Sequence, residues 1–156
     1  MSELHADIEA SFSERGPLAR SVAGFRVRTQ QVAMAQRVAQ VLLEARILIA
    51  EAGTGTGKTF AYLVPALLHG GKVIISTGTK TLQDQLFHRD IPAVRAAFGA
   101  PVTIALLKGR ANYVCHHYLD RALGEARLPS RDEVRHLGAI ERFARQSVSG
   151  DKSELS

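Results

Sequence analysis

Residues 52–59 read Ala-Gly-Thr-Gly-Thr-Gly-Lys-Thr, and they separate a short apolar run at 47–49 from an amphipathic stretch at 58–68. Glycines at alternate positions let the backbone curl until several N–H groups point at one centre. A lysine at the start of a helix adds an ammonium group to the partial positive charge of that helix end. The order apolar run, loop and helix therefore predicts a loop that binds the phosphates of a nucleotide.

Each residue of this loop has an expected part in binding ATP or a similar nucleotide. Lys58 is expected to neutralise the β- and γ-phosphates, and the Thr59 hydroxyl to hold Mg²⁺, so these two are the candidate catalytic residues. The full set of candidate nucleotide-binding residues in the loop is Ala52, Gly53, Thr54, Gly55, Thr56, Gly57, Lys58 and Thr59.

Apolar runs alternate with helical patterns along the middle of the chain. Helical spacing predicts helices over 30–45, 58–68, from a cap at Thr79 to 87, and over 92–98. Continuous apolar runs predict buried strands at 47–49, 73–75 and 102–107. This alternation indicates an α/β fold with a mostly parallel sheet. After it, residues 112–126 and 129–148 both predict helices, and Ser130 with Glu133 forms a capping box for the second.

The composition of the chain indicates its binding partners and its location in the cell. The net charge is +5, and a basic surface favours polyanions such as nucleic acid. The single cysteine, Cys115, excludes an internal disulfide and indicates a reducing, cytoplasmic location. No apolar run reaches the roughly 18 residues that span a bilayer, so no membrane partner is expected.

Four stretches in a fixed order carry a resemblance to a known family. They are 25–31 (Phe-Arg-Val-Arg-Thr-Gln-Gln), 51–65 around the glycine-rich loop, 76–85 (Ser-Thr-Gly-Thr-Lys-Thr-Leu-Gln-Asp-Gln) and 108–115 (Lys-Gly-Arg-Ala-Asn-Tyr-Val-Cys). Over about residues 24–150 the chain resembles the iron–sulfur superfamily 2 DNA helicases, the DinG/XPD-like group and its YoaA-type members. Ala52 stands where the loop usually begins with glycine, a substitution that helicases commonly carry.

The resemblance implies roles for residues outside the loop. Gln31 would contact adenine, although an ordinary surface position on a helix is an equal alternative. Thr77, Thr79 and Lys80 would touch the backbone of single-stranded DNA, the alternative being a helix cap and a solvated lysine. Cys115 would be the first ligand of a 4Fe–4S cluster. We expect that cluster only in a full-length parent, because one thiolate cannot hold it.

The resemblance also implies an organisation and an activity. Residues 1–24 would be a leader, 25–110 an incomplete RecA-like P-loop NTPase domain, and 111–156 the helical start of the iron–sulfur region. In the whole enzyme, ATP hydrolysis would drive DNA unwinding in DNA repair. The resemblance indicates no particular protein partner. This chain corresponds to the N-terminal part.

Two missing features limit what the chain alone is expected to do. Its Asp132–Glu133 pair opens a predicted helix and does not follow a strand, so it is no magnesium-binding Walker B pair. The second motor domain is also missing, and we therefore expect nucleotide binding without steady hydrolysis. Two alternatives remain open: another P-loop NTPase or a small-molecule kinase, and a non-catalytic nucleic-acid-binding fragment.

Overall fold

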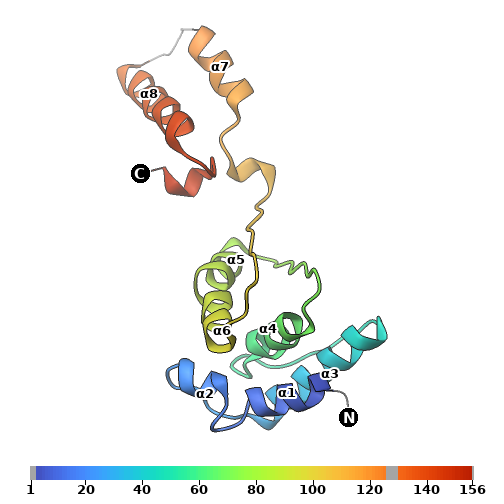
Figure 1. Cartoon of the computed structure of the whole chain (residues 1–156). Coiled ribbons are helices and arrows are strands. Elements are labelled where there is room, and N and C mark those ends of the chain that lie inside the picture. The colour runs from blue at the N-terminus through green and yellow to red at the C-terminus, as the bar shows by residue number, and fades with distance from the viewer. Residues whose placement is uncertain (1–2, 126–129, 156) are drawn as a thin grey trace. The chain divides into compact units, whose positions relative to one another are not determined.

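The computed structural model describes residues 3–125 and 130–155, which belong to two compact units, Met1–Ala105 and Leu106–Ser156. Figure 1 shows the helices of each unit in chain order. Within the described residues, every helix is too short or too polar to cross a membrane.

Three helices open the first unit and already contribute to its core. They are α1 (Glu3–Ser11), α2 (Pro17–Ser21) and α3 (Thr29–Glu44). Ile8, Phe12 and Leu18 are fully buried in one apolar cluster with residues of later helices. Residues 1–24, which we expected to be a leader, contain both α1 and α2.

The first unit is organised around the packing of α3 on α4 (Lys58–His69). The buried side chains of α3 recur every four residues, at Gln31, Ala35 and Ala39, so they lie on one face. Two of the three are alanine, which lets a neighbouring helix come close. α4 buries Ala61 and Val64 in the same core, and the predicted helices at 30–45 and 58–68 are both confirmed.

A bent helical segment completes the first unit. It consists of α5 (Lys80–Gln85), a π-helical turn (Leu86–Asp90) and α6 (Ile91–Phe98). Asp90 is buried and accepts hydrogen bonds from Gln85 Nε2 at 2.8 Å and from Arg89 Nε at 2.9 Å. The prediction of two helices here is confirmed, and the π-helical turn joins them without a break.

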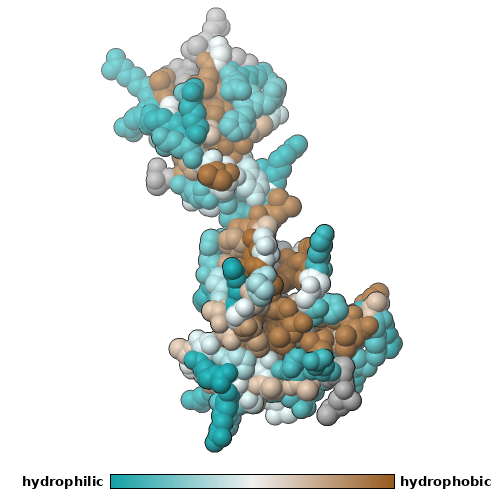
Figure 2. Space-filling model, in the orientation of Figure 1, coloured by the Kyte–Doolittle hydropathy of each residue, from teal (hydrophilic) through white to brown (hydrophobic). Residues whose placement is uncertain are grey.

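The predicted parallel sheet is wrong, because the residues that the structure describes contain no β-strand. The three segments expected as buried strands, 47–49, 73–75 and 102–107, are irregular and largely open to solvent. Ile47, Ile49 and Ile74 are 91%, 95% and 96% exposed. Figure 2 shows the resulting apolar surface as brown areas over the first unit. The α/β, RecA-like expectation is thus replaced by a helical arrangement.

The error has a physical reason. A strand exists only when a neighbour accepts and donates its backbone hydrogen bonds, and an apolar run says nothing about that neighbour. In the described parts of the chain, the only β-bridge joins Tyr113 to Asp151, and neither residue belongs to these segments. Burial still alternates along 102–107, where Val102, Ile104 and Leu106 are half-buried and the residues between them are exposed. The alternation of burial that is typical of a strand is present in this segment, but among the described residues no neighbouring strand pairs with it.

The second unit is built from α7 (His116–Glu125) and α8 (Arg131–Gln146), with 3₁₀ turns at Arg110–Asn112 and Lys152–Glu154. The side chain of Ser130 accepts a hydrogen bond from the backbone N–H of Glu133 at 3.2 Å. This confirms the predicted cap, which satisfies one of the free N–H groups at the start of α8.

A buried ion pair closes the second unit by joining its two ends. Lys108 Nζ lies 2.7 Å from Asp151 Oδ2, with side chains only 6% and 10% exposed. The backbone N–H of Lys108 donates to the Tyr113 hydroxyl at 2.8 Å, and Asp151 Oδ1 accepts from the Ser153 N–H at 2.9 Å. Residues more than forty positions apart are therefore held together by charge-assisted hydrogen bonds.

This pair makes the second unit sensitive to acid. The Lys108 hydrogen bond, followed by those from Ser153, lowers the pKa of Asp151 from 3.8 to about 2. A carboxyl whose pKa is lower in the folded state stabilises the fold above its unfolded pKa. That contribution is complete above about pH 4 and is lost as the pH falls towards 2.

We predict that Asp151→Asn lowers the melting temperature at pH 7, because it leaves the Lys108 ammonium buried without its counter-charge. The same variant should lose less stability than the parent between pH 4 and pH 2. Thermal unfolding followed by circular dichroism measures both effects. Asp132→Asn is the control, since Asp132 pairs with Arg135 on the surface at 79% exposure. Equal behaviour of the two variants would contradict the assignment.

Candidate nucleotide-binding site

The glycine-rich loop has the backbone geometry that its sequence predicts. Gly55 and Gly57 have φ angles of 79° and 81°, a left-handed region that residues with a Cβ rarely enter. Gly57 is also the N-cap residue of α4. The chain therefore turns sharply over residues 52–57 and enters the helix with the N–H groups of its first turn free of helical partners.

Lys58 lies over the loop that precedes it. Its Nζ donates to the carbonyl oxygens of Ala52 at 2.6 Å and Gly53 at 2.7 Å. The Thr56 hydroxyl donates to the same Gly53 carbonyl at 2.9 Å. An ammonium group has three hydrogens, so one remains for an anion at the helix start. The ammonium group of Lys58 is thus held beside the loop glycines and the N-terminus of α4.

Gln31 reaches this loop from α3. Its Nε2 donates to the carbonyl oxygen of Gly57 at 2.8 Å, and the residue is only 2% exposed. Its Oε1 is buried without a hydrogen-bond partner, which costs on the order of 1–3 kcal/mol. The surface position that we weighed for Gln31 is wrong: the side chain belongs to the interface between α3 and α4.

The Thr59 side chain interacts with Tyr62, which lies one turn further along α4. Burial raises the pKa of the Tyr62 hydroxyl, the hydrogen bond with Thr59 opposes that rise, and the charge of Asp90 adds to it. The predicted magnesium ligand therefore already has a hydroxyl partner within α4.

A hollow of about 360 Å³ lies beside the loop, between it and the outer face of α3. It is lined by Gln30, Ala33, Met34, Arg37, Leu48, Ala50, Glu51, Ala52, Gly53 and Thr56. Gln31 is not part of its wall, although the neighbouring Gln30 is.

A family comparison decides what this loop belongs to. The profile of the DEAD/DEAH box helicases matches residues 32–112, which include the whole loop and α4. The chain belongs to the DEAD/DEAH box helicase family.

Individual relatives belong to the group that the sequence resembles. The chain is 46% identical over 143 residues to the ATP-dependent DNA helicase YoaA of Haemophilus influenzae, covering 92% of this chain and 22% of the relative. Identity to YoaA of Escherichia coli is also 46%, and the 3'-5' exonuclease DinG of Bacillus subtilis is 34% identical over 89% of this chain. The predicted likeness to the DinG and YoaA group is confirmed.

The match is partial on the relatives' side. The chain spans about a fifth of the length of the YoaA helicases that it matches. No solved structure matches it.

The residues predicted to contact DNA lie at the start of α5. Thr79 caps that helix, with its hydroxyl accepting from the Leu82 N–H at 3.3 Å, and the Thr77 hydroxyl donates to the Thr79 carbonyl at 3.2 Å. Lys80 is exposed. The alternative role of Thr79 as a helix cap is confirmed, while contact with DNA stays a prediction.

The glycine-rich loop belongs to the first unit and Cys115 to the second. Cys115 is an exposed free cysteine in the second unit, next to the start of α7. In the parts of the chain that the structure describes, no three histidine, cysteine or acidic residues come together as metal ligands. Asp132 and Glu133 occupy the first turn of α8, as expected from their sequence context.

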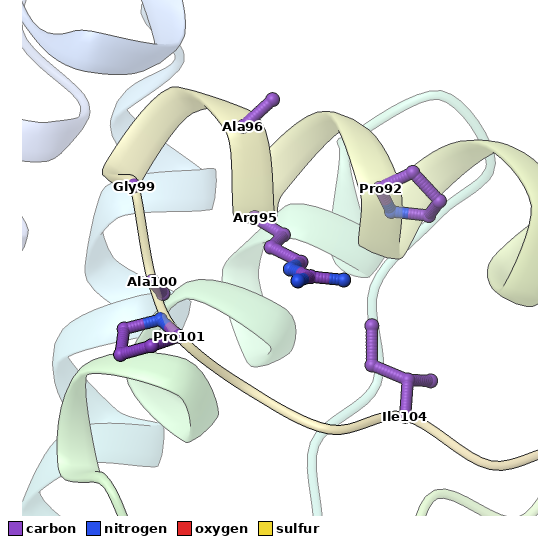
Figure 3. A pocket seen from close by; sticks show the side chains of 7 residues that line it. All are labelled: Pro92, Arg95, Ala96, Gly99, Ala100, Pro101 and Ile104. Atoms are coloured by element: carbon purple, nitrogen blue, oxygen red, sulfur yellow. The ribbon is translucent and has the colours of Figure 1, made fainter.

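A second hollow, of about 460 Å³, lies away from the glycine-rich loop. It is formed by Pro92, Arg95, Ala96, Gly99, Ala100, Pro101 and Ile104. Figure 3 shows the Arg95 guanidinium extending between α6 and the segment that carries Ile104. One arginine among apolar walls offers no acid–base pair, so residues 52–59 remain the candidate site.

Sequence reasoning missed two contacts of the site. The Gln31–Gly57 hydrogen bond had a signal in the spacing of Gln31, Ala35 and Ala39, which puts a glutamine on the buried face of α3. The Thr59–Tyr62 pair had a signal in its three-residue spacing on α4.

We predict that Gly57→Ala destabilises the first unit by about 1–3 kcal/mol, combining backbone strain with steric overlap. A Cβ at Gly57 would overlap Gln31 Nε2 and Cδ, whereas Gly70 has a similar φ of 74° with open space around it. Gly70→Ala therefore carries the strain without the overlap and serves as the control. Thermal unfolding should show the larger loss for Gly57→Ala, and equal losses would contradict the Gln31 contact.

Proposed function

We propose that residues 52–59 bind the triphosphate of ATP with Mg²⁺, and that the chain is the ATP-binding part of an ATP-dependent DNA helicase. The observation that carries this is the loop: two left-handed glycines lead into α4 while Lys58 keeps its ammonium group over the turn.

The donor set suits a polyphosphate. Free N–H groups at the start of α4 and the helix dipole favour negative charge, and Lys58 adds a full positive charge beside them. A carboxylate needs fewer donors than this loop offers. Phosphate oxygens would compete with the carbonyls of Ala52 and Gly53 for Lys58.

Thr59 is the candidate ligand for Mg²⁺, which prefers oxygen donors and commonly bridges phosphate and protein. Its hydroxyl would exchange its present partner, Tyr62, for the metal. The ion would supply charge neutralisation of the phosphates.

DNA unwinding driven by ATP hydrolysis is proposed for a longer chain, such as the relatives whose names state that activity. For the 156 residues themselves we propose binding without steady turnover. Asp132 and Glu133 lie in the first turn of α8, after its Ser130 cap, and do not follow a strand as a Walker B pair would. Cys115 supplies a single thiolate, so a 4Fe–4S cluster is proposed only where three more are present. A role on DNA would fit the cytoplasmic location that we propose.

Lys58→Ala should weaken binding of ATP with Mg²⁺ by at least about tenfold, because a charge-assisted contact contributes about 1.5–3 kcal/mol. Isothermal titration calorimetry on the full chain measures the affinity. Lys72→Ala is the matched control, since Lys72 is an exposed lysine outside the loop. Unchanged affinity in Lys58→Ala, or equal losses in both variants, would refute the proposal.

We propose further that Thr77, Thr79 and Lys80 contact the backbone of single-stranded DNA. Hydroxyls and an exposed lysine beside a helix start can hold phosphates without reading sequence. Lys80 is the member that carries charge.

Lys80→Ala should therefore reduce the slope of log affinity against log salt by about 0.7, the value for one lost contact to a single strand. Fluorescence anisotropy with a labelled oligothymidine at several salt concentrations measures the slope. Lys72→Ala again removes one charge elsewhere on the first unit. A slope that changes as much in this control would show general charge attraction and count against a track at residues 77–80.

A further inference from the structure

The hollow of about 460 Å³ beside α6 uses a side of that helix that the core leaves open. Its wall includes the positions i, i+3, i+4 and i+7, which share one side of a helix and are Pro92, Arg95, Ala96 and Gly99. Another side of α6 faces the core, where Val94 is fully buried and Phe98 packs against the apolar cluster. The hollow is therefore a surface feature that the fold of the first unit does not fill.

A tight turn after α6 closes one end of the hollow. Gly99 has a φ of 58° and ends the helix, and the N–H of Ala100 donates to the Arg95 carbonyl at 3.2 Å. The N–H of Val102 donates to the Ala100 carbonyl at 2.9 Å, and Pro101 has no N–H. The backbone of residues 100–102 therefore offers a ligand no free donor. Arg95 is the one charged residue in the wall.

The charge of Arg95 is not used within the described parts of the chain. Arg89, in the same bent segment, pairs with Asp90 at 2.9 Å, whereas the Arg95 side chain makes no hydrogen bond or ion pair with a described residue. Figure 3 shows its guanidinium extending between α6 and the segment that carries Ile104, with Pro92 and Pro101 nearby. A cation thus lies among apolar groups without a counter-charge.

This combination selects one kind of anion. A guanidinium binds a carboxylate through two parallel hydrogen bonds, which one arginine can supply alone. A phosphate group carries more charge and needs several donors, and this wall does not provide them. The proline rings and Ile104 suit an apolar group next to the charge. The hollow therefore fits a carboxylate joined closely to an apolar group.

The shallow form of the hollow favours a protein segment over a small molecule. A pocket for a small ligand buries most of that ligand, whereas five of the seven lining residues here are exposed, namely Pro92, Arg95, Ala96, Gly99 and Pro101. An open surface of this kind can hold one or two side chains of a longer partner. The net charge of +5 also attracts acidic partners.

We propose that the hollow beside α6 docks an acidic segment of a partner protein, in which an aspartate or glutamate neighbours a large apolar side chain. The carboxylate pairs with Arg95, and the apolar side chain lies against Pro101 and Ile104. This contact is independent of the nucleotide and DNA contacts proposed above, so either can fail without the other.

A model peptide tests the docking site on the full chain. The probe is Gly-Gly-Leu-Glu-Phe-Gly-Gly, acetylated and amidated so that its glutamate is the only charge. Titration into ¹⁵N-labelled protein should shift amide signals at residues 95–104, with a dissociation constant on the order of 0.1–1 mM for one charged contact and one or two apolar side chains. Two matched peptides carry Gln in place of the glutamate, or Ala in place of both apolar residues. Both should bind more weakly.

Arg95→Gln removes the charge and should weaken binding of the glutamate peptide about three- to tenfold, between the effects of an exposed ion pair and of a charge-assisted hydrogen bond. Arg26→Gln is the matched control, because Arg26 is an exposed arginine of the same unit outside the hollow. Arg95→Glu reverses the charge. It should lose the glutamate peptide and bind a peptide with lysine at the same position better than the parent does.

Each outcome decides the matter. Loss in Arg95→Gln but not in Arg26→Gln, together with the charge-reversal rescue, supports the proposal. No shifts at residues 95–104 up to several millimolar peptide, or equal losses in the two arginine variants, overturns it. Equal binding of the glutamine peptide excludes recognition of a carboxylate and also overturns it. If 4-phenylbutyrate binds as tightly as the peptide with the same dependence on Arg95, the occupant is a small carboxylate and the protein partner is refuted.

Discussion

The close packing of α3 against α4 is the contact on which the rest of the first unit depends. It exists because α3 presents Gln31, Ala35 and Ala39 along one face, and the two alanines let the helices approach. A large side chain at either alanine would separate the helices and force the core to repack. At the end of this face that lies nearest the loop, the side-chain amide of Gln31 donates a hydrogen bond to the Gly57 carbonyl. The same face of α3 therefore both packs against α4 and holds the loop in position.

The loop combines two kinds of constraint. Gly55 and Gly57 supply a left-handed backbone that leaves the N–H groups of the α4 start unpaired by the helix. Lys58 binds two carbonyls of the same loop, so its charge is held in place by the turn that it completes. Because these contacts are local, most of the site comes from one continuous stretch of chain. Gln31 is the exception, since it comes from a helix that precedes the loop.

The two units are stabilised in different ways. In the first, the core is formed by helices, and Ile47, Ile49 and Ile74 stay largely in water, so they add little burial free energy. In the second, a nearly buried Lys108–Asp151 pair joins residues distant in sequence and is supported by Tyr113 and Ser153. Acid weakens the second unit through Asp151.

The amino-acid sequence by itself determined the helices, their caps and the phosphate loop. These depend on contacts within a few residues: the apolar period of 30–45, the glycine that stops α4, the Ser130 cap of α8 and the glycines before Lys58. It also determined the family, because four stretches of defined spacing are specific together.

Only the tertiary structure decided where non-local partners lie. The apolar runs at 47–49, 73–75 and 102–107 predicted strands wrongly, because a strand requires a neighbour that no single run encodes. The partners of Gln31 and of Lys108 were unforeseen for the same reason, since spacing put Gln31 on the buried face of α3 without indicating Gly57. A hydrogen bond or an ion pair between distant residues has no local pattern, and it forms only when packing brings the two groups within about 3 Å.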